Sequence, residues 1–247
     1  MRNNFIKLEA REKAQLFRRS NGYGSTDPIS LTSLLIKNNI ITLFKPLSDQ
    51  YSGMAIKILD DSRFILVNQK NVIGRQRFTI SHELYHLFFQ DEFTSQKCIT
   101  CLFDKQQDID EKKADYFASY FLLPDEGIME LIPNIEKTCQ NKISTETIFK
   151  IQQYYRISIN AVIFRLNELD LVDKSYFNLF TNEKANIARS LGYETSLYFS
   201  GNEGRIIGDY CILANSLFKE SKLSESQYFD MLNAINFDPF KKNIEGE

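Results

Sequence analysis

The spacing of apolar residues along the chain predicts a protein that is mainly helical. In most segments apolar positions recur every three or four residues, which is the period of one face of an α-helix. Turn residues such as Asn21-Gly22 and Pro124 separate these segments. We therefore expect helices over residues 8–21, 31–38, 74–89, 110–123, 182–191, 206–221 and 225–236, with two more between 143 and 172.

Strand character is confined to one early part of the chain. Short apolar runs rich in β-branched and aromatic residues cover residues 40–45, 53–59 and 63–68, and Asp60-Asp61-Ser62 joins the last two. We expect these runs to form a small antiparallel sheet that packs on the helix over 74–89. The edge of such a sheet is also where an extended peptide can add as one more strand.

Polar residues support the predicted starts of the helices in the second half of the chain. Ser144 or Thr145 and then Ser158 stand where the two helices between 143 and 172 would begin, and their hydroxyls can accept from free backbone N–H groups. Ser224 with Gln227 forms the pattern of a capping box for the last helix.

Composition describes an ordinary globular protein of 247 residues, with 43% hydrophobic and 25% charged residues. A net charge of −2 argues against a dedicated nucleic-acid binder. No apolar run approaches the roughly 18 residues that a membrane helix needs, and the first residues lack the apolar core of a signal peptide. We therefore expect a cytoplasmic protein with no membrane contact.

The only two histidines of the chain, His82 and His86, fall within His82-Glu83-Leu84-Tyr85-His86. Residues four apart lie on one face of a helix, so two imidazoles can bind one metal ion. Zinc lowers the pKa of a water molecule from about 16 to about 7, and Glu83 is placed to take a proton from the attacking water and deliver it to the leaving amine. The alternative is an ordinary amphipathic helix. Apolar neighbours such as Phe78 and Leu84 place the histidines against a buried face and favour the metal site.

A catalytic zinc ion usually has three protein ligands, and the chain has no third histidine. Glu111 is the first candidate, with Cys101 and Asp91 as weaker ones. Small residues at Ala114 and Ala118 would let the helix over 110–123 approach the histidines closely. Asp115, one turn after Glu111, would accept a hydrogen bond from the outer nitrogen of His82 or His86, unless it is simply a solvated helix residue.

The four cysteines include the pair Cys98-Ile99-Thr100-Cys101, which has the spacing of a zinc knuckle or a redox pair. A structural zinc site would need two more ligands, and only Cys139 and Cys211 remain, at irregular distances. We expect reduced, incidental thiols.

Two segments together resemble the ImmA/IrrE family of metallopeptidases. Arg77-Phe78-Thr79-Ile80-Ser81-His82-Glu83-Leu84-Tyr85-His86 is similar to the family pattern RFTxxHExxH, and the run from Glu111 to Pro124 is similar to ExxA(N/D)xFAxxLLxP. The resemblance implies that His82, His86 and Glu111 bind zinc and that Glu83 is the catalytic carboxylate. Many members carry glycine where this chain has Tyr85, which either narrows the cleft or simply packs.

The segment 157–166 looks like the second helix of a helix-turn-helix unit. In that interpretation Asn160 and Arg165 would reach a DNA groove. Few basic residues support such a surface, so we prefer a helical hairpin that covers the core and do not expect direct DNA binding.

Taken together, these features predict an α+β fold: a zincin-like core of helices with a small antiparallel sheet, followed by a mainly helical C-terminal region. We expect a metallopeptidase domain over 1–135, a helix-turn-helix-like hairpin over 136–175 and a helical region over 176–247. The predicted activity is that of a zinc-dependent endopeptidase. The resemblance implies a helix-turn-helix transcriptional repressor as its protein substrate, in mobile-element or stress-response regulation. The alternatives are a non-catalytic, metal-containing regulator that binds a repressor or DNA, and a metal hydrolase of small molecules.

Overall fold

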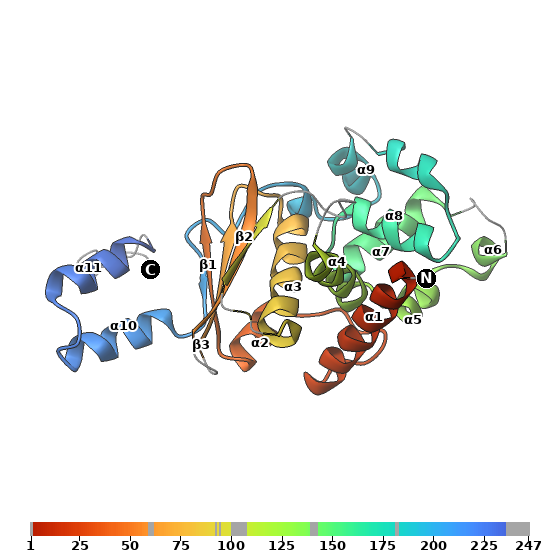
Figure 1. Cartoon of the computed structure of the whole chain (residues 1–247). Helices are drawn as coiled ribbons and strands as arrows, with labels where there is room; N and C mark the ends of the chain where they lie inside the picture. Colours follow the sequence, from red (N-terminus) through yellow and green to blue (C-terminus); the bar gives the residue numbers. More distant parts are fainter. Residues whose placement is uncertain are drawn as a thin grey trace.

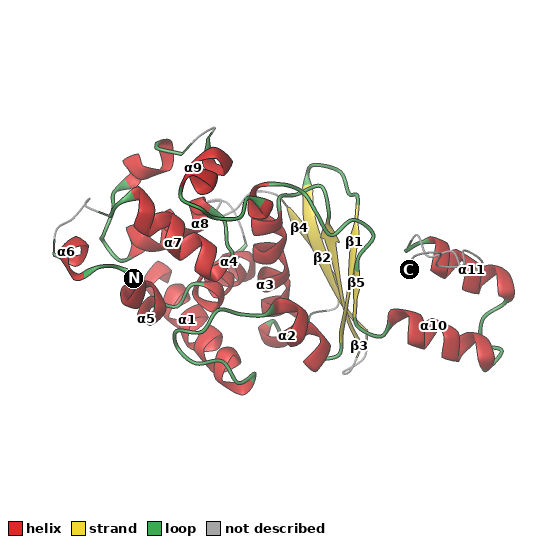
Figure 2. Ribbon diagram, turned by 180° about the vertical axis from the view of Figure 1, so that it is seen from behind, coloured by secondary structure: helices red, strands yellow, loops and turns green. Residues whose placement is uncertain are grey.

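A computed structural model describes residues 2–58, 62–91, 93, 95–99, 108–138, 143–180 and 183–235. Its sheet lies between a large helical body and a separate hairpin of two helices near the C-terminus (Figures 1 and 2). The strands are β1 (Ile40–Lys45), β2 (Tyr51–Ile58), β3 (Ser62–Asn68), β4 (Ser95–Ile99) and β5 (Ile206–Ile207). The helices are α1 (Arg2–Ser20), α2 (Leu31–Lys37), α3 (Ile73–Phe89), α4 (Ile109–Leu122), α5 (Asp125–Leu131), α6 (Asn134–Lys137), α7 (Thr145–Tyr155), α8 (Ile159–Glu168), α9 (Lys184–Ser190), α10 (Tyr210–Lys219) and α11 (Glu225–Asn233). The α+β class and the helical C-terminal region are as predicted, and the proposed domain boundaries remain predictions.

The sheet is mixed, which corrects the expectation of an antiparallel sheet. Its order is β4-β2-β3-β1-β5, and β1 runs parallel to β3 while the other pairs are antiparallel. The chain therefore leaves β1, passes over β3 and returns as β2. The buried side chain of Asn68 holds this crossover: it accepts from the backbone N–H of Leu47 and donates to the carbonyls of Ser48 and Tyr51.

Two strands were absent from the prediction. β4 comes from a stretch without regular alternation of apolar and polar residues, and it is recognisable only through its pairing with β2. β5 occupies the first residues of the helix predicted from 206, because Ile206 and Ile207 pair with β1 and the helix begins only at Tyr210. Strand pairing of this kind depends on residues far away in the chain, which local spacing does not reveal.

Helix α3 packs across one face of the sheet, closest to β2. At Gly53 of β2 an added Cβ would lie 2.6 Å from Thr79 Cγ2 of α3 and 2.7 Å from the carbonyl oxygen of Leu66, so only glycine fits. Arg75, in the first turns of α3, donates to the hydroxyl of Ser52 at 3.1–3.2 Å. This hydrogen bond and the close packing of Thr79 against Gly53 fix the distance between α3 and the sheet.

On its other side α3 packs against α4, which in turn packs against α1. Small side chains let α1 and α4 approach closely: Ala10, Ala14, Ala114 and Ala118 are all fully buried. The ring of Phe17 on α1 lies 4.8 Å from that of Phe88 and 5.6 Å from that of Phe121, centroid to centroid. Three helices therefore share one apolar core, and α4 is held firmly beside the histidines.

The region 143–172 forms the predicted helical hairpin of α7 and α8. Ser144 and Ser158 cap these helices through their side chains, as expected. Arg165 is buried rather than exposed: its guanidinium pairs with Asp125 and Glu168 and lies 4.2 Å from the ring centroid of Tyr120. Arg165 therefore cannot reach a DNA groove, which removes one of the two residues on which the helix-turn-helix interpretation rested.

The C-terminal helices α10 and α11 pair with each other and project beyond the sheet (Figure 1). The capping box of Ser224 and Gln227 is present at the start of α11, as predicted. Among the described residues, no helix combines the length and apolar character needed to cross a lipid bilayer.

Candidate metal site

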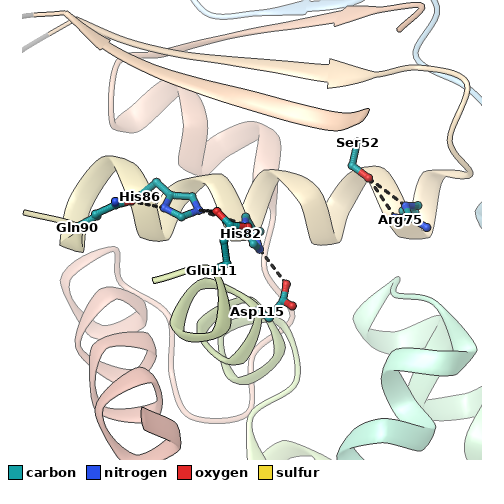
Figure 3. Close-up of polar contacts among 7 residues, drawn as sticks. All are labelled: Ser52, Arg75, His82, His86, Gln90, Glu111 and Asp115. Atoms are coloured by element: carbon teal, nitrogen blue, oxygen red, sulfur yellow. Dashed lines mark hydrogen bonds and ion pairs between the residues drawn. The ribbon is translucent and has the colours of Figure 1, made fainter. Parts of the chain in front are cut away.

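The two histidines lie in the second half of α3, on the face that looks toward α4 (Figure 3). Both are buried, with 1% of each residue exposed. Helix α3 continues through Leu87 to Phe89, and its apolar side chains anchor it in the core on both sides of the pair. The imidazoles are thus held by a rigid helix rather than by a loop.

Helix α4 brings Glu111 to the same point. Its Oε2 lies 3.2 Å from His82 Nε2, its Oε1 lies 3.3 Å from His86 Nε2, and the two Nε2 atoms are 3.1 Å apart. These three residues are the cluster of potential metal ligands found in the described part of the chain.

The donor set and its spacing fit a tetrahedral metal ion. Zinc binds imidazole nitrogen and carboxylate oxygen at about 2.0–2.2 Å, and tetrahedral angles then place neighbouring ligand atoms about 3.3–3.6 Å apart. The two Nε2 atoms are 3.1 Å apart, and each has one oxygen of Glu111 within 3.3 Å, so the three side chains converge closely enough to share one metal ion. Three protein ligands leave a fourth position for water or substrate, as in catalytic zinc sites.

The outer nitrogen of each imidazole has its own acceptor. His82 Nδ1 donates to Asp115 Oδ1 at 2.9 Å, and His86 Nδ1 donates to Gln90 Oε1 (Figure 3). Protonation at Nδ1 leaves the Nε2 lone pair of each ring directed at the cluster, which is the tautomer that a metal ion requires. Asp115 is 1% exposed, so it is not the solvated residue of the alternative interpretation.

The charge of Glu111 suits a cation. Burial alone would raise the pKa of this carboxyl group, but with no metal ion bound, hydrogen bonds from protonated His82 and His86 and their positive charge lower the pKa to about 2. The group is therefore ionised at neutral pH, and it offers a negative charge between two rings that are otherwise neutral or positive.

Glu83 leaves α3 in a different direction from the histidines and lies against β2. It is fully buried, and its Oε1 is 3.7 Å from the position that a Cβ on Gly53 would take. The carboxylate thus sits between α3 and the strand that pairs with the edge strand β4. The glycine at position 53 leaves room for it.

Tyr85 simply packs. It is 1% exposed, its ring lies 5.8 Å from that of Phe117, and the ammonium group of Lys13 is 5.2 Å from its centroid. The ring fills space between α3, α4 and α1. The tyrosine at this position, where many family members carry glycine, therefore packs in the hydrophobic core and does not narrow the cleft.

Of the two weaker ligand candidates, only Asp91 belongs to the described residues. Asp91 is exposed and lies outside the cluster. Cys101 and Cys139 lie outside the described residues, whereas Cys98 belongs to β4 and Cys211 is an exposed free thiol. The role expected for these cysteines therefore stays a prediction.

Two neighbours of the histidines escaped the sequence analysis. Gln90 lies one helical turn after His86, and this spacing is a signal that could have found it. Phe93 stacks on His86, with ring centroids 5.5 Å apart and an interplanar angle of 19°. It follows the end of α3, so helical spacing could not reveal it.

A family model for the IrrE N-terminal-like domain, Peptidase_M78, matches residues 38–167, which is more than half of the chain. The chain belongs to this peptidase family. The match runs from β1 to α8 and so includes α3, α4 and all three residues of the cluster. Membership and the potential metal ligands together indicate a metallopeptidase that acts on protein. A comparison with curated proteins finds no match to the chain.

Proposed function

We propose that this chain is a zinc-dependent endopeptidase in which His82, His86 and Glu111 hold the metal ion and Glu83 is the catalytic acid and base. The observation that carries this proposal is the close approach of three side chains: the two imidazole Nε2 atoms are 3.1 Å apart, and each has one oxygen of the Glu111 carboxylate within 3.3 Å. When bound there, zinc would supply a water molecule of pKa about 7 and would polarise the carbonyl of the substrate.

The chain's own residues then perform the proton transfers. Glu83 accepts a proton from the attacking water and delivers it to the amine nitrogen as the peptide bond breaks. Its burial between α3 and β2 keeps bulk water away from the carboxylate. Asp115 and Gln90 keep the two imidazoles in the required tautomer throughout.

We propose the free edge of β4 as the place where an extended substrate binds. β4 is the terminal strand of the described sheet, next to β2, against which Glu83 lies. An added strand would gain backbone hydrogen bonds from β4 and would bring one peptide bond toward the cluster.

The proposed substrate is a helix-turn-helix transcriptional repressor, cleaved at one site in the cytoplasm. This part of the proposal rests on the resemblance of Arg77–His86 and Glu111–Pro124 to the ImmA/IrrE pattern. Cleavage between the DNA-binding and oligomerisation parts of a repressor would release its operator and switch on the genes that it controls.

The experiment is to incubate the purified chain with the repressor encoded beside its gene and to identify fragments by mass spectrometry. We expect one specific cut that stops when a chelator removes the metal and returns with added zinc. Glu83→Gln should slow the cut by about 10²–10⁴-fold because it removes the proton acceptor but keeps the shape. Glu12→Gln, an exposed change on α1, is the matched control and should leave the rate unchanged. A repressor that loses DNA binding without being cut would instead favour the non-catalytic regulator.

A further inference from the structure

A cavity of about 240 Å³ lies beside the first half of α3 and is lined by three arginines and no acidic residue. The arginines are Arg77 on α3, Arg156 at the end of α7 and Arg205 just before β5. The three arginines are far apart in the sequence, and the fold brings their positive charges together around one cavity. None of the three forms an ion pair with any residue in the described part of the chain.

Arg77 is the least exposed of the three arginines. Its Nη2 donates to the carbonyl of Ile29 at 2.9 Å, but its buried Nε meets no acceptor among the described residues. Burial and the nearby charge of Arg156 lower its pKa to about 10. Burial is the larger of these two effects, and Arg156 adds a like charge nearby.

The other two arginines are exposed, and neither has an acidic partner among the described residues. Arg156 occupies the left-handed turn that ends α7, with φ of 55°, and this turn directs the chain back toward α8. Arg205 donates to Asn202 Oδ1 at 2.8 Å and to Thr32 Oγ1 at 3.0 Å, both of them uncharged acceptors. All three positive charges therefore remain available to a ligand.

The wall of the cavity is held by a polar scaffold. The buried Gln76 of α3 donates to the carbonyls of Gln69, Asn71 and Gly201, and its Oε1 accepts from Asn202 Nδ2 at 2.8 Å. These bonds fasten the segment before β5 to α3. The arginines thus stand on fixed elements, as a binding site requires.

We propose that this cavity binds a small molecule with a phosphate-like oxyanion group and an apolar body. Guanidinium groups match the geometry of phosphate oxygens and can donate two parallel hydrogen bonds each. Apolar side chains complete the lining: Leu31, Phe44, Ile73, Ile80 and Ile207. A volume of about 240 Å³ accommodates a small ligand and excludes a folded macromolecule.

Binding there would connect the ligand to the metal cluster through one helix. Arg77 and Gln76 belong to α3, the helix that carries both histidines. A ligand that bridges Arg77, Arg156 and Arg205 would tie α3 to the end of α7 and to the segment before β5. This site rests on its own residues and is independent of the proposed peptidase reaction.

The test is calorimetric titration of the full chain with phenyl phosphate, inorganic phosphate and phenol at constant ionic strength. We expect saturable binding of phenyl phosphate, weaker binding of inorganic phosphate and none of phenol. Arg156→Gln and Arg205→Gln should each weaken phenyl phosphate binding by about tenfold or more, because each removes a charged donor. Arg189→Gln, an exposed arginine on α9 outside the cavity, is the matched control and should bind like the wild type.

Either of two results would overturn the proposal. One is the absence of saturable phenyl phosphate binding by the wild type up to about 10 mM. The other is equal affinity in the wild type and in the Arg156→Gln and Arg205→Gln variants, which would place the anion elsewhere, for instance at the metal. Unchanged near-ultraviolet circular dichroism of both variants serves to exclude misfolding as the cause of lost binding.

Discussion

His82 and Asp115, on two different helices, share a buried hydrogen bond of 2.9 Å between Nδ1 and Oδ1. This bond ties the metal-binding face of α3 to α4 and selects the tautomer of His82. Asp115→Asn should therefore lower zinc affinity by about 10–100-fold, a range typical of partners of metal-binding histidines. Competition with a chelating dye measures this affinity. Asp230→Asn, an exposed change on α11, should have no effect, and equal affinities of both variants would contradict the assigned role.

Gln90 accepts the hydrogen bond from the outer nitrogen of His86, as Asp115 does for His82, but it is a weaker acceptor. Its amide oxygen is a neutral acceptor, and the residue is half-buried, whereas Asp115 is a buried carboxylate. Charge-assisted hydrogen bonds are about twice as strong as neutral ones. In the same dye assay Gln90→Ala should thus cost less zinc affinity than Asp115→Ala. The reverse order would show that Asp115 is mainly structural.

Gly53 sets the distance between β2 and α3. A methyl group at this position would overlap Thr79 and the carbonyl of Leu66, so the strand or the helix must shift. We expect Gly53→Ala to lower the free energy of unfolding by about 1–3 kcal/mol, as overpacking does. Urea denaturation measures the change, with Ser48→Ala in the exposed loop before β2 as the control. Wild-type stability of the Gly53→Ala variant would refute the close packing.

Arg165 tests whether the hairpin of α7 and α8 is structural. Its charge is buried with Asp125 and Glu168, and removal of one member of such a group is costly. Arg165→Leu should lower the free energy of unfolding by about 3 kcal/mol, the low end for such losses, because Arg11 and Lys7 still pair with the two carboxylates. Asn160→Ala, at an exposed position of α8, should cost less than about 0.5 kcal/mol in the same denaturation experiment.

Glu9 links α1 to α4 through Lys113 and also pairs with Lys13. Burial alone would raise its pKa, but the two lysines lower it below the ordinary 4.5. A lowered pKa adds stability above pH 4.5 and loses it as the pH falls through the folded value. Glu9→Gln should therefore destabilise the protein at pH 7 by less than about 1 kcal/mol, since the pair is partly exposed, and this cost should shrink as the pH falls below 4.5. Glu12→Gln, at an exposed position of the same helix, is the control in urea denaturation.

The candidate metal ligands could be predicted from the sequence because their spacing along each helix is a local signal. His82 and His86 are one helical turn apart, and the chemistry of the ligands directed attention to Glu111 once no third histidine was available. The spacing of Glu111 and Asp115 placed both on one face of α4. The resemblance to the ImmA/IrrE family independently implied the same metal ligands.

The parts that escaped prediction depend on distant contacts. The parallel pairing of β1 with β3 requires a crossover that Asn68 fastens through its side chain, and no local pattern encodes this. β4 has little apolar alternation and is defined by its partner β2. Arg165 would reach a DNA groove in the helix-turn-helix interpretation, yet two carboxylates compensate its charge in the interior, which is rare for arginine.

Zinc K-edge X-ray absorption of the metal-loaded chain identifies the atoms that bind the zinc ion. With His82, His86 and Glu111 as ligands, we expect one zinc ion per chain with only nitrogen and oxygen neighbours at about 2.0–2.2 Å. Glu111→Ala should lose most of this bound zinc, whereas Glu12→Ala should keep it. A sulfur neighbour at about 2.3 Å would instead bring a cysteine into the site and contradict the assignment of the third ligand.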